Sequence, residues 1–378
     1  MQINIETHMK LEVGISERLG EILSKTYGSC LLIIDSGFSN TAMGNIIKKT
    51  LQNELDLTII ETKSSNEPTY DDIDAYLQTV EFKTFQRNEN LDKSVVLGVG
   101  GGSAMDIAKV IAALLTNAGS PLKYRGFDEL QNPGVDCYLV PTTAGTGSES
   151  SYNASLIDKG ANKKMGINGR FMYATGSFLD PAIMLDCPTE IALSSAVDAF
   201  VHCVEGFICN NSNPISDGLA MRGLELIWTG LSVFRGEGKK IEHWTNLMLG
   251  AHIGGIVQMN SGSGIAAAIS YPLGVYHSVP HGIGGGIFAP GIMKFNQQNG
   301  ITKYSKLNYI SGGDFVNDTV ETFAEIGVPQ NLSQYGLFSS HREHLVEIMA
   351  TQQAAFDQNP IAFNAKTDFG KFITTYLE

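Results

Sequence analysis

The sequence has few basic residues for its length. Its 378 residues include 26 lysines and arginines against 39 aspartates and glutamates, which gives a formal net charge of −13. A net-acidic protein is repelled by nucleic acids and anionic membranes unless its basic residues gather in a stripe, and the sequence shows no such stripe. We therefore expect neither a nucleic acid nor a membrane as a partner.

Cysteines are also few, and long apolar runs are missing. The five cysteines form no CxxC pair, and their odd number argues against a disulfide framework. The first residues show no basic segment followed by an apolar core, and no stretch approaches the roughly 20 apolar residues of a membrane helix. These absences predict a soluble, cytoplasmic protein. The cysteines are Cys30, Cys137, Cys187, Cys203 and Cys209.

The order of apolar runs predicts two domains. Continuous apolar runs of the buried-strand type alternate with helical patterns up to residue 186, which is typical of a parallel sheet covered on both faces. Beyond Pro188 the pattern is helical. We expect a Rossmann-like α/β domain over residues 1–186 and an all-helical domain over residues 187–378. The expected strands are 30–35, 57–61, 94–99, 137–140 and 165–167, and the expected helices are 191–207, 216–234, 242–256, 320–326 and 341–356.

A glycine cluster follows one of these strands and begins a helix. Gly100, Gly101 and Gly102 precede Ser103, where we expect the helix to start. A helix N-terminus offers unpaired N–H groups and the positive end of the helix dipole, so this pattern favours a bound phosphate. A simple tight turn would have the same sequence. Asp106 lies in the first turn, and Lys109 is expected to be a solvated helix residue.

A second polar cluster follows the next strand and can line the same ligand. Its hydroxyl groups belong to Thr142, Thr143, Thr146 and Ser148. Asp35, at the end of an early strand, can accept hydrogen bonds from an adenine ribose and would repel a 2′-phosphate. Together these clusters predict a dinucleotide site that favours NAD over NADP, although each alone is compatible with an ordinary loop.

Acidic and imidazole side chains recur at helical spacing in the second half of the chain. Asp198 and His202 lie four residues apart, so a helix places them on one face, where they could bind one divalent ion. A chance pair with this spacing is common. His277 and His281 have the same spacing and would share a face if they were helical.

In order along the chain, these motifs resemble the iron-containing alcohol dehydrogenase family. The resemblance covers residues 100–109, 141–149, 180–181, 198–202 and 272–282. It implies a dinucleotide-binding domain followed by a helical domain, a homodimer, and one aspartate and three histidines that bind iron or zinc. Asp198, His202 and His281 match three of these four positions.

The fourth metal position does not match the family, because it is Ala267 here. A further active-site histidine of the family is replaced by Tyr271. Three interpretations stay open: the three remaining ligands hold the metal, His277 completes the site, or the metal has been lost. The stretches 115–117, 124–128, 202–205 and 270–271 resemble the branch that includes 3-deoxy-octulosonate 8-oxidase, which favours a polar, sugar-like alcohol as the substrate.

The resemblance implies hydride transfer between NAD(H) and a primary alcohol or aldehyde. A divalent metal, if retained, would act as a Lewis acid. Without it, Tyr271 or His277 would have to supply a proton or a hydrogen bond, and Lys164 could touch the cofactor. Alternatives are a metal-free reductase of the same family, a lyase like dehydroquinate synthase, and a nucleotide-binding protein without turnover.

Overall fold

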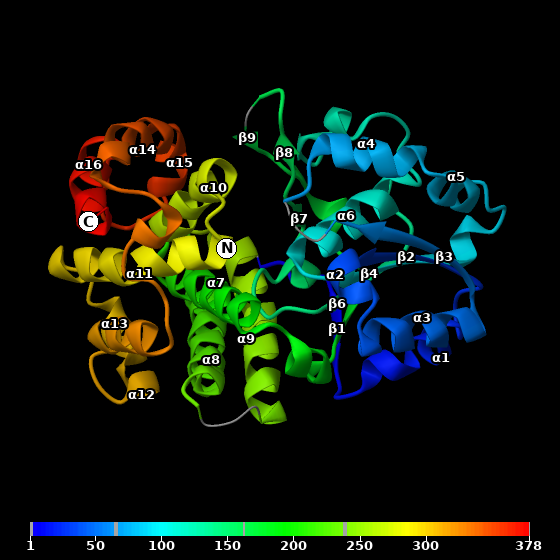
Figure 1. The fold of residues 1–378 in the computed structure, drawn as a ribbon, viewed down its shortest axis with the longest axis horizontal. Coiled ribbons are helices and arrows are strands. Elements are labelled where there is room, and N and C mark those ends of the chain that lie inside the picture. Colours follow the sequence, from blue (N-terminus) through cyan, green and yellow to red (C-terminus); the bar gives the residue numbers. More distant parts are fainter. Residues whose placement is uncertain (1–2, 64–66, 162, 237–239, 378) are drawn as a thin grey trace. The chain divides into compact units, whose positions relative to one another are not determined.

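The computed structural model describes residues 3–63, 67–161, 163–236 and 240–377 (Figure 1). The chain forms two compact units. The α/β unit comprises Ile5–Thr143 and Gly147–Cys187, and the helical unit comprises Met1–Asn4, Ala144–Thr146 and Pro188–Glu378.

The α/β unit contains a six-stranded sheet in the order β1-β11-β6-β4-β2-β3, and every neighbouring pair is parallel. This confirms the predicted parallel sheet, and the four expected strands 30–35, 57–61, 94–99 and 137–140 form within about one residue of their predicted ends. Strands β1 and β11 were not predicted. The side chains of β1 are mostly exposed, whereas those of the four-residue β11 are buried. The strands are β1 (His8–Leu11), β2 (Ser29–Asp35), β3 (Asp56–Thr62), β4 (Ser94–Gly100), β6 (Cys137–Pro141) and β11 (Gly176–Leu179).

Helices cover both faces of this sheet (Figure 1). Leu31 and Ile33 of β2 belong to the core cluster that contains residues of α4, α5 and α6. Their neighbours Cys30, Leu32 and Ile34 belong to the cluster on the other face, with residues of α1 and α3. This alternation explains why the strand is apolar at every position. The helices of this unit are α1 (Leu19–Leu23), α2 (Ser36–Ser39), α3 (Ala42–Glu54), α4 (Tyr70–Gln78), α5 (Val80–Gln86) and α6 (Gly102–Leu114).

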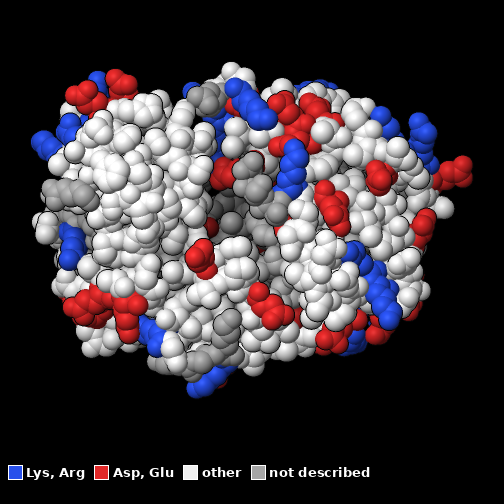
Figure 2. Space-filling model, in the orientation of Figure 1, with Lys and Arg blue, Asp and Glu red and all other residues white. Residues whose placement is uncertain are grey.

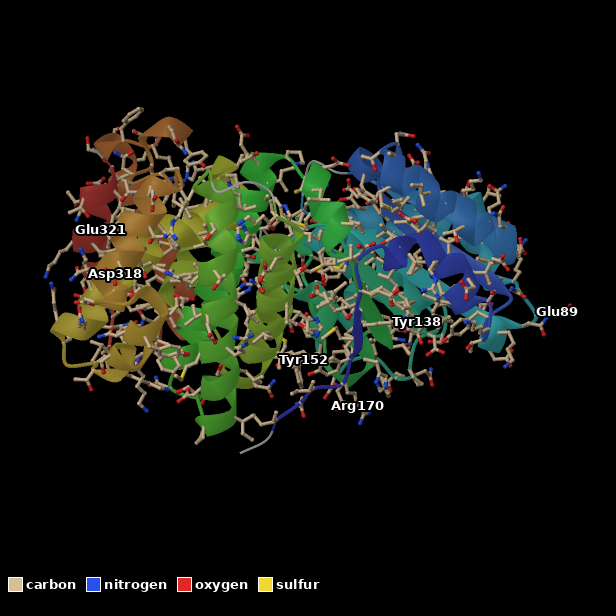
Figure 3. The ribbon with its side chains drawn as sticks, turned by 90° about the horizontal axis from the view of Figure 1, so that it is seen from below. Glu89, Tyr138, Tyr152, Arg170, Asp318 and Glu321 are labelled. Carbon is tan, nitrogen blue, oxygen red and sulfur yellow. The ribbon has the colours of Figure 1, made fainter. Side chains whose placement is uncertain are left out.

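Aromatic packing joins two strands near the edge of the sheet. Tyr138 of β6, labelled in Figure 3, stacks on Phe178 of β11, with ring centroids 5.4 Å apart and an interplanar angle of 16°. Tyr27 meets the edge of the Tyr138 ring. These contacts extend the core to the strands beyond β4.

Among the described residues, five two-residue strands lie between β4 and β11 along the chain, and one prediction fails here. The sequence predicts a strand over residues 165–167, but the structure has Met165 and Gly166 between β9 and β10. Met165 instead donates its N–H to the carbonyl of Leu156. The short strands are β5 (Gly126–Phe127), β7 (Asn153–Ala154), β8 (Ile157–Asp158), β9 (Lys163–Lys164) and β10 (Ile167–Asn168).

The helical unit has a core of its own, built mainly from α10, α11 and the C-terminal helices. The predicted helix 216–234 ends earlier, at Gly230, and continues as a 3₁₀ turn. The predicted helix 341–356 is divided into α14 and α15. The helices are α7 (Thr189–Ile208), α8 (Pro214–Gly230), α9 (Ile241–Ser261), α10 (Ile265–His277), α11 (His281–Gln298), α12 (Asn308–Ser311), α13 (Phe315–Glu325), α14 (Arg342–Met349), α15 (Gln353–Phe356) and α16 (Thr367–Phe372).

One helix corrects the expectation that no apolar stretch reaches membrane-spanning length. Helix α7 has the required length and a mean hydropathy of 1.5 over its most apolar window, but 78% of that window is buried inside the protein. A buried core helix meets the same criteria, so this match is weak evidence for a membrane span.

Acidic and basic side chains are interspersed over the visible face of the α/β unit (Figure 2). The visible face of the helical unit carries larger areas without charge.

Candidate active site

The α/β unit brings Asp35 and Gly100 together at the carboxyl ends of neighbouring strands. From β2 the chain continues to β3, toward one edge of the sheet, and from β4 it continues to β6, toward the opposite edge. The direction of the strand order therefore reverses between the neighbouring strands β2 and β4. Ligands of open parallel sheets bind at such a reversal, beyond the carboxyl ends of the strands. The sequence predicted these two residues as cofactor contacts, and the topology places both at this point.

Gly100 is required by this close approach. Its φ of +155° is one that residues with side chains rarely adopt. A Cβ atom here would lie 2.6 Å from the Cβ of Ala104 and 2.9 Å from the Cβ of Asp35. The glycine therefore allows strand β4 to turn into α6 beside the end of β2.

Asp35 is held in a fixed orientation. Its Oδ1 accepts hydrogen bonds from the N–H groups of Gly37 (2.9 Å) and Phe38 (3.2 Å), so it caps helix α2. Burial raises the pKa of this carboxyl, while the two N–H groups act in the opposite direction. Oδ2 takes no part in these two bonds, so the carboxylate keeps an acceptor at the strand end.

Helix α6 begins without a side-chain cap. Its N-cap residue is Gly101, and among the described residues no side chain accepts a hydrogen bond from the first turn as a cap. Gly101, Gly102 and Ser103 are half-buried, so the start of the helix is accessible. Uncapped N–H groups and the helix dipole together favour an anion at this position.

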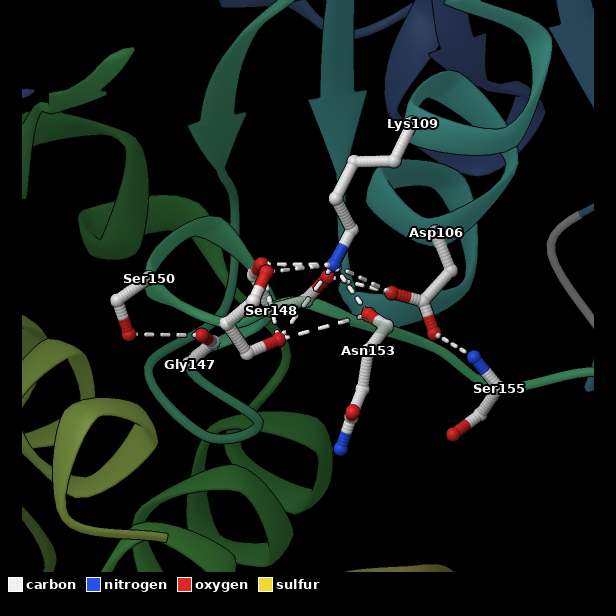
Figure 4. Close-up of polar contacts among 8 residues, drawn as sticks. Asp106, Lys109, Gly147, Ser148, Ser150, Asn153 and Ser155 are labelled. Carbon is white, nitrogen blue, oxygen red and sulfur yellow. Dashed lines mark hydrogen bonds and ion pairs between the residues drawn. The ribbon is translucent and has the colours of Figure 1, made fainter. Parts of the chain in front are cut away.

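Lys109 corrects the expectation of a solvated side chain, because only 3% of it is exposed. Its Nζ donates to the carbonyls of Ser148 (2.9 Å) and Asn153, and it lies 3.3 Å from Asp106 Oδ1 (Figure 4). A buried ammonium needs such acceptors, and the loop after β6 provides them.

Asp106 fixes the same loop. Its Oδ1 accepts a 2.5 Å hydrogen bond from the Ser148 hydroxyl, and its Oδ2 accepts one of 2.8 Å from the N–H of Ser155 (Figure 4). Both carboxylate oxygens are thus engaged within the protein. Asp106 and Lys109 together hold Ser148 beside the first half of α6.

Of the other residues predicted to bind the cofactor, two lie beside the glycine turn after β4 and two lie elsewhere. Thr142 donates its N–H to the carbonyl of Gly100 (3.0 Å), so it lies beside the glycine turn. Thr143 lies close to Gly101. Thr146 belongs to the helical unit. Lys164, in β9, forms a 2.7 Å ion pair with Glu67.

The helical unit brings Asp198, His202 and His281 together. One ligand atom from each lies within 4.8 Å of the others. The Nε2 atoms of His202 and His281 are 3.6 and 3.7 Å from Asp198 Oδ1, which is longer than a hydrogen bond. A tetrahedral ion with bonds of about 2.1 Å would hold neighbouring donor atoms roughly 3.4 Å apart. This spacing, and a set of two imidazoles and one carboxylate, fit a divalent transition metal.

Close helix packing creates this spacing. A Cβ atom at Gly282 would lie 1.9 Å from the carbonyl oxygen of Ser194 and 2.9 Å from the Cβ of Asp198. Only glycine fits here, so the start of α11 lies directly against α7. His281, the first residue of α11, is thereby brought beside Asp198.

His277 and His281 do not share a helix face, so the conditional prediction of an i, i+4 pair is wrong. Helix α10 ends at His277, because Ser278 has a left-handed φ of 54° and Pro280 follows shortly after. His277 is not among the three clustered ligands and instead contacts the ring of His344 at 6.0 Å. Burial, with His344 and His341 nearby, lowers the pKa of His277.

Tyr271 lies beside the cluster of possible metal ligands formed by Asp198, His202 and His281. Its ring centroid is 4.8 Å from that of His281, with the planes tilted by 43°. Ala267 lies one helical turn earlier and is buried, with 2% exposure. Its methyl group offers no ligand atom to a metal ion.

Two polar residues next to this group had no predicted role. Glu205 is buried, and its carboxylate accepts hydrogen bonds from the N–H groups that begin α10: Gly264 (2.8 Å), Ala266 (2.6 Å) and Ala267 (3.3 Å). Burial raises the pKa of Glu205 to about 7, against the effect of these three bonds. Ser270 contacts His281. The sequence signals were their helical spacing from His202 and Ala267 and their place in the stretches 202–205 and 270–271 that resemble a branch of the family.

Comparison with known proteins agrees with this geometry. Residues 7–181 match the model of the iron-containing alcohol dehydrogenases, and residues 192–368 match the C-terminal model of the same family. Alcohol dehydrogenase 4 of Saccharomyces cerevisiae is 27% identical over 93% of this chain and 92% of its own length. Sulfoacetaldehyde reductase of Bilophila wadsworthia is 31% identical over 80% of this chain and 76% of its own length.

A solved structure shows the same fold. Sulfoacetaldehyde reductase from Bifidobacterium kashiwanohense, in complex with NAD⁺, superposes with a TM-score of 0.84 at 20% identity, over 100% of this chain and 98% of that one. The matched models, the relatives and the fold all point the same way: this chain belongs to the iron-containing alcohol dehydrogenase family.

Proposed function

We propose that the protein transfers a hydride between NAD(H) and a primary alcohol or aldehyde, with a divalent ion held by Asp198, His202 and His281. The convergence of these three side chains carries the proposal, because their separations suit an ion and are too long for hydrogen bonds. In the oxidative direction, the alcohol carbon loses a hydride to C4 of the nicotinamide, and its hydroxyl loses a proton.

The α/β unit supplies the residues for the dinucleotide. The uncapped start of α6, with Gly100, Gly101, Gly102 and Ser103, would hold the pyrophosphate. Asp35 would accept hydrogen bonds from the adenine ribose, and its charge favours NAD over NADP. The NAD⁺ complex of the related sulfoacetaldehyde reductase supports this choice.

The loop after β6 would complete the dinucleotide site. Thr142 and Thr143 lie next to the glycine turn, while Asp106 holds Ser148 in place through its hydroxyl. Thr146 and Lys164 are further proposed contacts. The ion pair with Glu67 would then orient the Lys164 ammonium.

When bound, a divalent iron or zinc ion supplies Lewis-acid stabilisation of negative charge on the substrate oxygen. Asp198, His202 and His281 would hold it with one carboxylate and two imidazoles. Because Ala267 contributes no fourth ligand, this set leaves coordination positions for substrate and water.

Tyr271 is the proposed hydrogen-bond donor to the substrate oxygen, because its ring already lies beside His281. His277 would have to leave its contact with His344 to act on the same proton. We further propose a polar, sugar-like alcohol as substrate, close to the branch that includes 3-deoxy-octulosonate 8-oxidase. A cytoplasmic homodimer completes the proposal.

Metal analysis tests the central claim. Protein purified without chelators should carry about one divalent ion per chain, and Asp198→Ala should remove the ion together with alcohol oxidation. Glu190 is an exposed acidic residue on the same helix, so Glu190→Ala should change neither the metal content nor the rate of alcohol oxidation. A wild-type protein that is active and free of metal would contradict the metal role.

A second candidate function is that of a reductase of the same family that works without metal. The alanine at position 267, in place of a metal ligand, favours this candidate. Turnover of aldehydes by metal-free wild-type protein, followed as loss of NADH absorbance, would support it. Binding of NADH without turnover across a broad aldehyde panel would instead support a binding protein. A lyase like dehydroquinate synthase would leave the total amount of NADH unchanged while converting its substrate.

A further inference from the structure

A small cavity lies inside the helical unit, beside the carboxylate that caps α10. Its lining residues are all buried and come mainly from α7 and α11. Four of them are polar, and each of these four is at most 5% exposed: Glu205, Cys209, Tyr304 and Asn359. The rest of the lining is apolar. The centre of a water molecule can occupy about 10 Å³ of this cavity, which is close to the least space that one buried water needs.

Two buried asparagines determine how the hydroxyl of Tyr304 is bonded. Asn359 Nδ2 donates to the carbonyl of Ile361 at 2.7 Å, and a carbonyl only accepts, so the orientation of this amide is fixed. The same Nδ2 donates to Asn296 Oδ1 at 2.8 Å, and Asn359 Oδ1 accepts from Asn296 Nδ2 at 2.9 Å. The nitrogen of Asn296 therefore also faces Tyr304 Oη, which accepts from it at 3.3 Å.

The proton of the Tyr304 hydroxyl is left without an acceptor among the described residues. Its Oη accepts from Asn296, and an amide nitrogen cannot accept in return. Burial raises the pKa of Tyr304, and Glu205 and Cys209 act in the same direction, so the hydroxyl keeps its proton. Tyr304 is only 1% exposed, and a buried donor costs free energy unless a group in the cavity accepts from it.

The other polar lining residues offer acceptors. The carboxylate of Glu205 has about four acceptor positions, and the N–H groups that begin α10 occupy three of them. Cys209 donates its S–H to the carbonyl of Ser263 at 2.9 Å, and burial raises the pKa of this thiol. Both N–H groups of Asn359 are used, which leaves its Oδ1 as an acceptor. The lining thus combines one available donor, on Tyr304, with acceptors on Glu205 and Asn359.

This combination selects a ligand by its hydrogen bonds. A metal ion or an ammonium ion cannot accept the proton of Tyr304. A simple anion cannot donate to Glu205 or Asn359, and the carboxylate would repel it. A water molecule accepts and donates, and it has the right size. We propose that the cavity is a binding site for one water molecule, which accepts from Tyr304 and donates to Glu205 and Asn359. This site is independent of the proposed hydride transfer.

The bound water would give Glu205 a partner in both of its protonation states. The N–H groups of α10 can only donate, so they cannot receive a proton from the carboxyl group. Burial raises the pKa of Glu205 to about 7, so both states are populated near neutral pH. The water donates to the carboxylate and accepts from the carboxylic acid. The cap of α10 therefore stays hydrogen-bonded when the charge of Glu205 changes.

A high-resolution crystal structure of the full-length protein tests the site directly. We expect one water peak in the cavity, about 2.7–3.0 Å from Tyr304 Oη and from an oxygen of Glu205 or Asn359. An empty cavity would overturn the proposal. A metal ion would also overturn it, and such an ion is recognised by several oxygen ligands at about 2.0–2.6 Å.

The pKa of Glu205 tests the site in solution, followed by the ¹³C resonance of its carboxyl group and assigned with Glu205→Gln. Tyr304→Phe removes the donor that holds the water, so the carboxylate should lose a hydrogen bond. We expect its pKa to rise from about 7 to about 8. Tyr376→Phe, at a tyrosine that does not line the cavity, should leave the pKa of Glu205 unchanged.

A second variant separates the water from a direct effect of Tyr304. Ala289 lines the cavity, and Ala289→Val adds two methyl groups there while keeping the hydroxyl of Tyr304. This variant should lose the water peak and show the same rise in the pKa of Glu205. An unchanged pKa of Glu205 in either Tyr304→Phe or Ala289→Val would overturn the proposal.

Discussion

Helices α6 and α10 start in the same way but use their N-termini differently. Each has a glycine as its N-cap and no side-chain cap of its own. At α10 the carboxylate of Glu205, from another helix, accepts hydrogen bonds from three N–H groups. At α6 no described side chain caps the first turn. One N-terminus is thus filled by the protein's own anion, and the other is available for a ligand's anion.

This contrast shows what decides whether a glycine-led helix start can bind a ligand. The backbone donors and the dipole are the same at both helices. The difference is the supply of a buried acceptor from elsewhere in the fold. The role of this acceptor can be tested by removing it from the start of α10 and by adding one to the start of α6. Both effects can then be compared with loss of a partly exposed side-chain cap at another helix.

The largest effect is expected from Glu205→Ala. It leaves three buried N–H groups without their acceptor, and each such group costs about 1–3 kcal/mol. We expect the free energy of unfolding to fall by at least about 3 kcal/mol, measured by urea denaturation. Glu190→Ala, exposed on the same helix, should change it by less than about 0.5 kcal/mol. A loss below 1 kcal/mol for Glu205→Ala would show that water replaces the carboxylate.

Gly101→Asp gives α6 the anion that it lacks. The backbone of Gly101, with φ −72°, accepts a side chain, and the nearest atom to its Cβ would be 3.5 Å away. The new carboxylate would repel the pyrophosphate and weaken NADH binding by about 100-fold, or about 2.7 kcal/mol, measured by calorimetry.

The same substitution should not destabilise the protein, because aspartate is a good N-cap. Gly101→Asn adds a side chain of similar size that can cap the helix but carries no charge. It therefore separates repulsion of the pyrophosphate from steric exclusion, and it should bind NADH more tightly than Gly101→Asp. Unchanged NADH affinity in Gly101→Asp would show that the pyrophosphate is not bound at α6.

The pH dependence of stability should show the cost of burying Glu205. Burial raises its pKa from 4.5 to about 7 in the folded state, so the folded protein holds this proton more tightly than the unfolded chain. The contribution to stability is therefore complete below pH 4.5 and is lost as the pH rises to 7. The loss should be on the order of 3 kcal/mol relative to Glu205→Gln, measured from unfolding midpoints at each pH. Parallel pH profiles for wild type and Glu205→Gln would refute it.

The smallest effect is expected at an ordinary cap. Asn213 caps α8 by accepting from the N–H groups of Ile215 and Ser216, both at 3.1 Å. Asn213→Ala should lower the free energy of unfolding by about 1 kcal/mol, and Asn213→Asp should restore it. If Asn213→Ala lowered the free energy of unfolding as much as Glu205→Ala, burial of the acceptor would not determine how much a helix cap contributes to stability.

Features carried by neighbouring residues could be predicted from the sequence. The strand, the glycine turn and the start of α6 are contiguous, and the structure places the helix start at Gly102, one residue before the predicted position. Asp198 and His202 follow from helical spacing alone. In both cases the backbone geometry of one element determines the arrangement.

Features that depend on packing between distant segments could not be predicted. Lys109 is buried because a loop about 40 residues later supplies its carbonyl acceptors, and no local pattern shows that. The break between His277 and His281 depends on the left-handed Ser278. The contacts of Glu205 and Ser270 arise from the packing of α7, α10 and α11, which spacing along one helix does not reveal.

The fit of Gly282 against Ser194 has an evolutionary consequence. Because this contact sets the separation of Asp198 and His281 through the helix backbones, we expect the pair to persist when other positions in the site mutate. A lineage can exchange the ligand at 267 for alanine and still inherit the remaining set intact. We expect relatives that keep glycine at 282 to vary freely at 267, 270 and 271, and so to diversify in the ion they prefer.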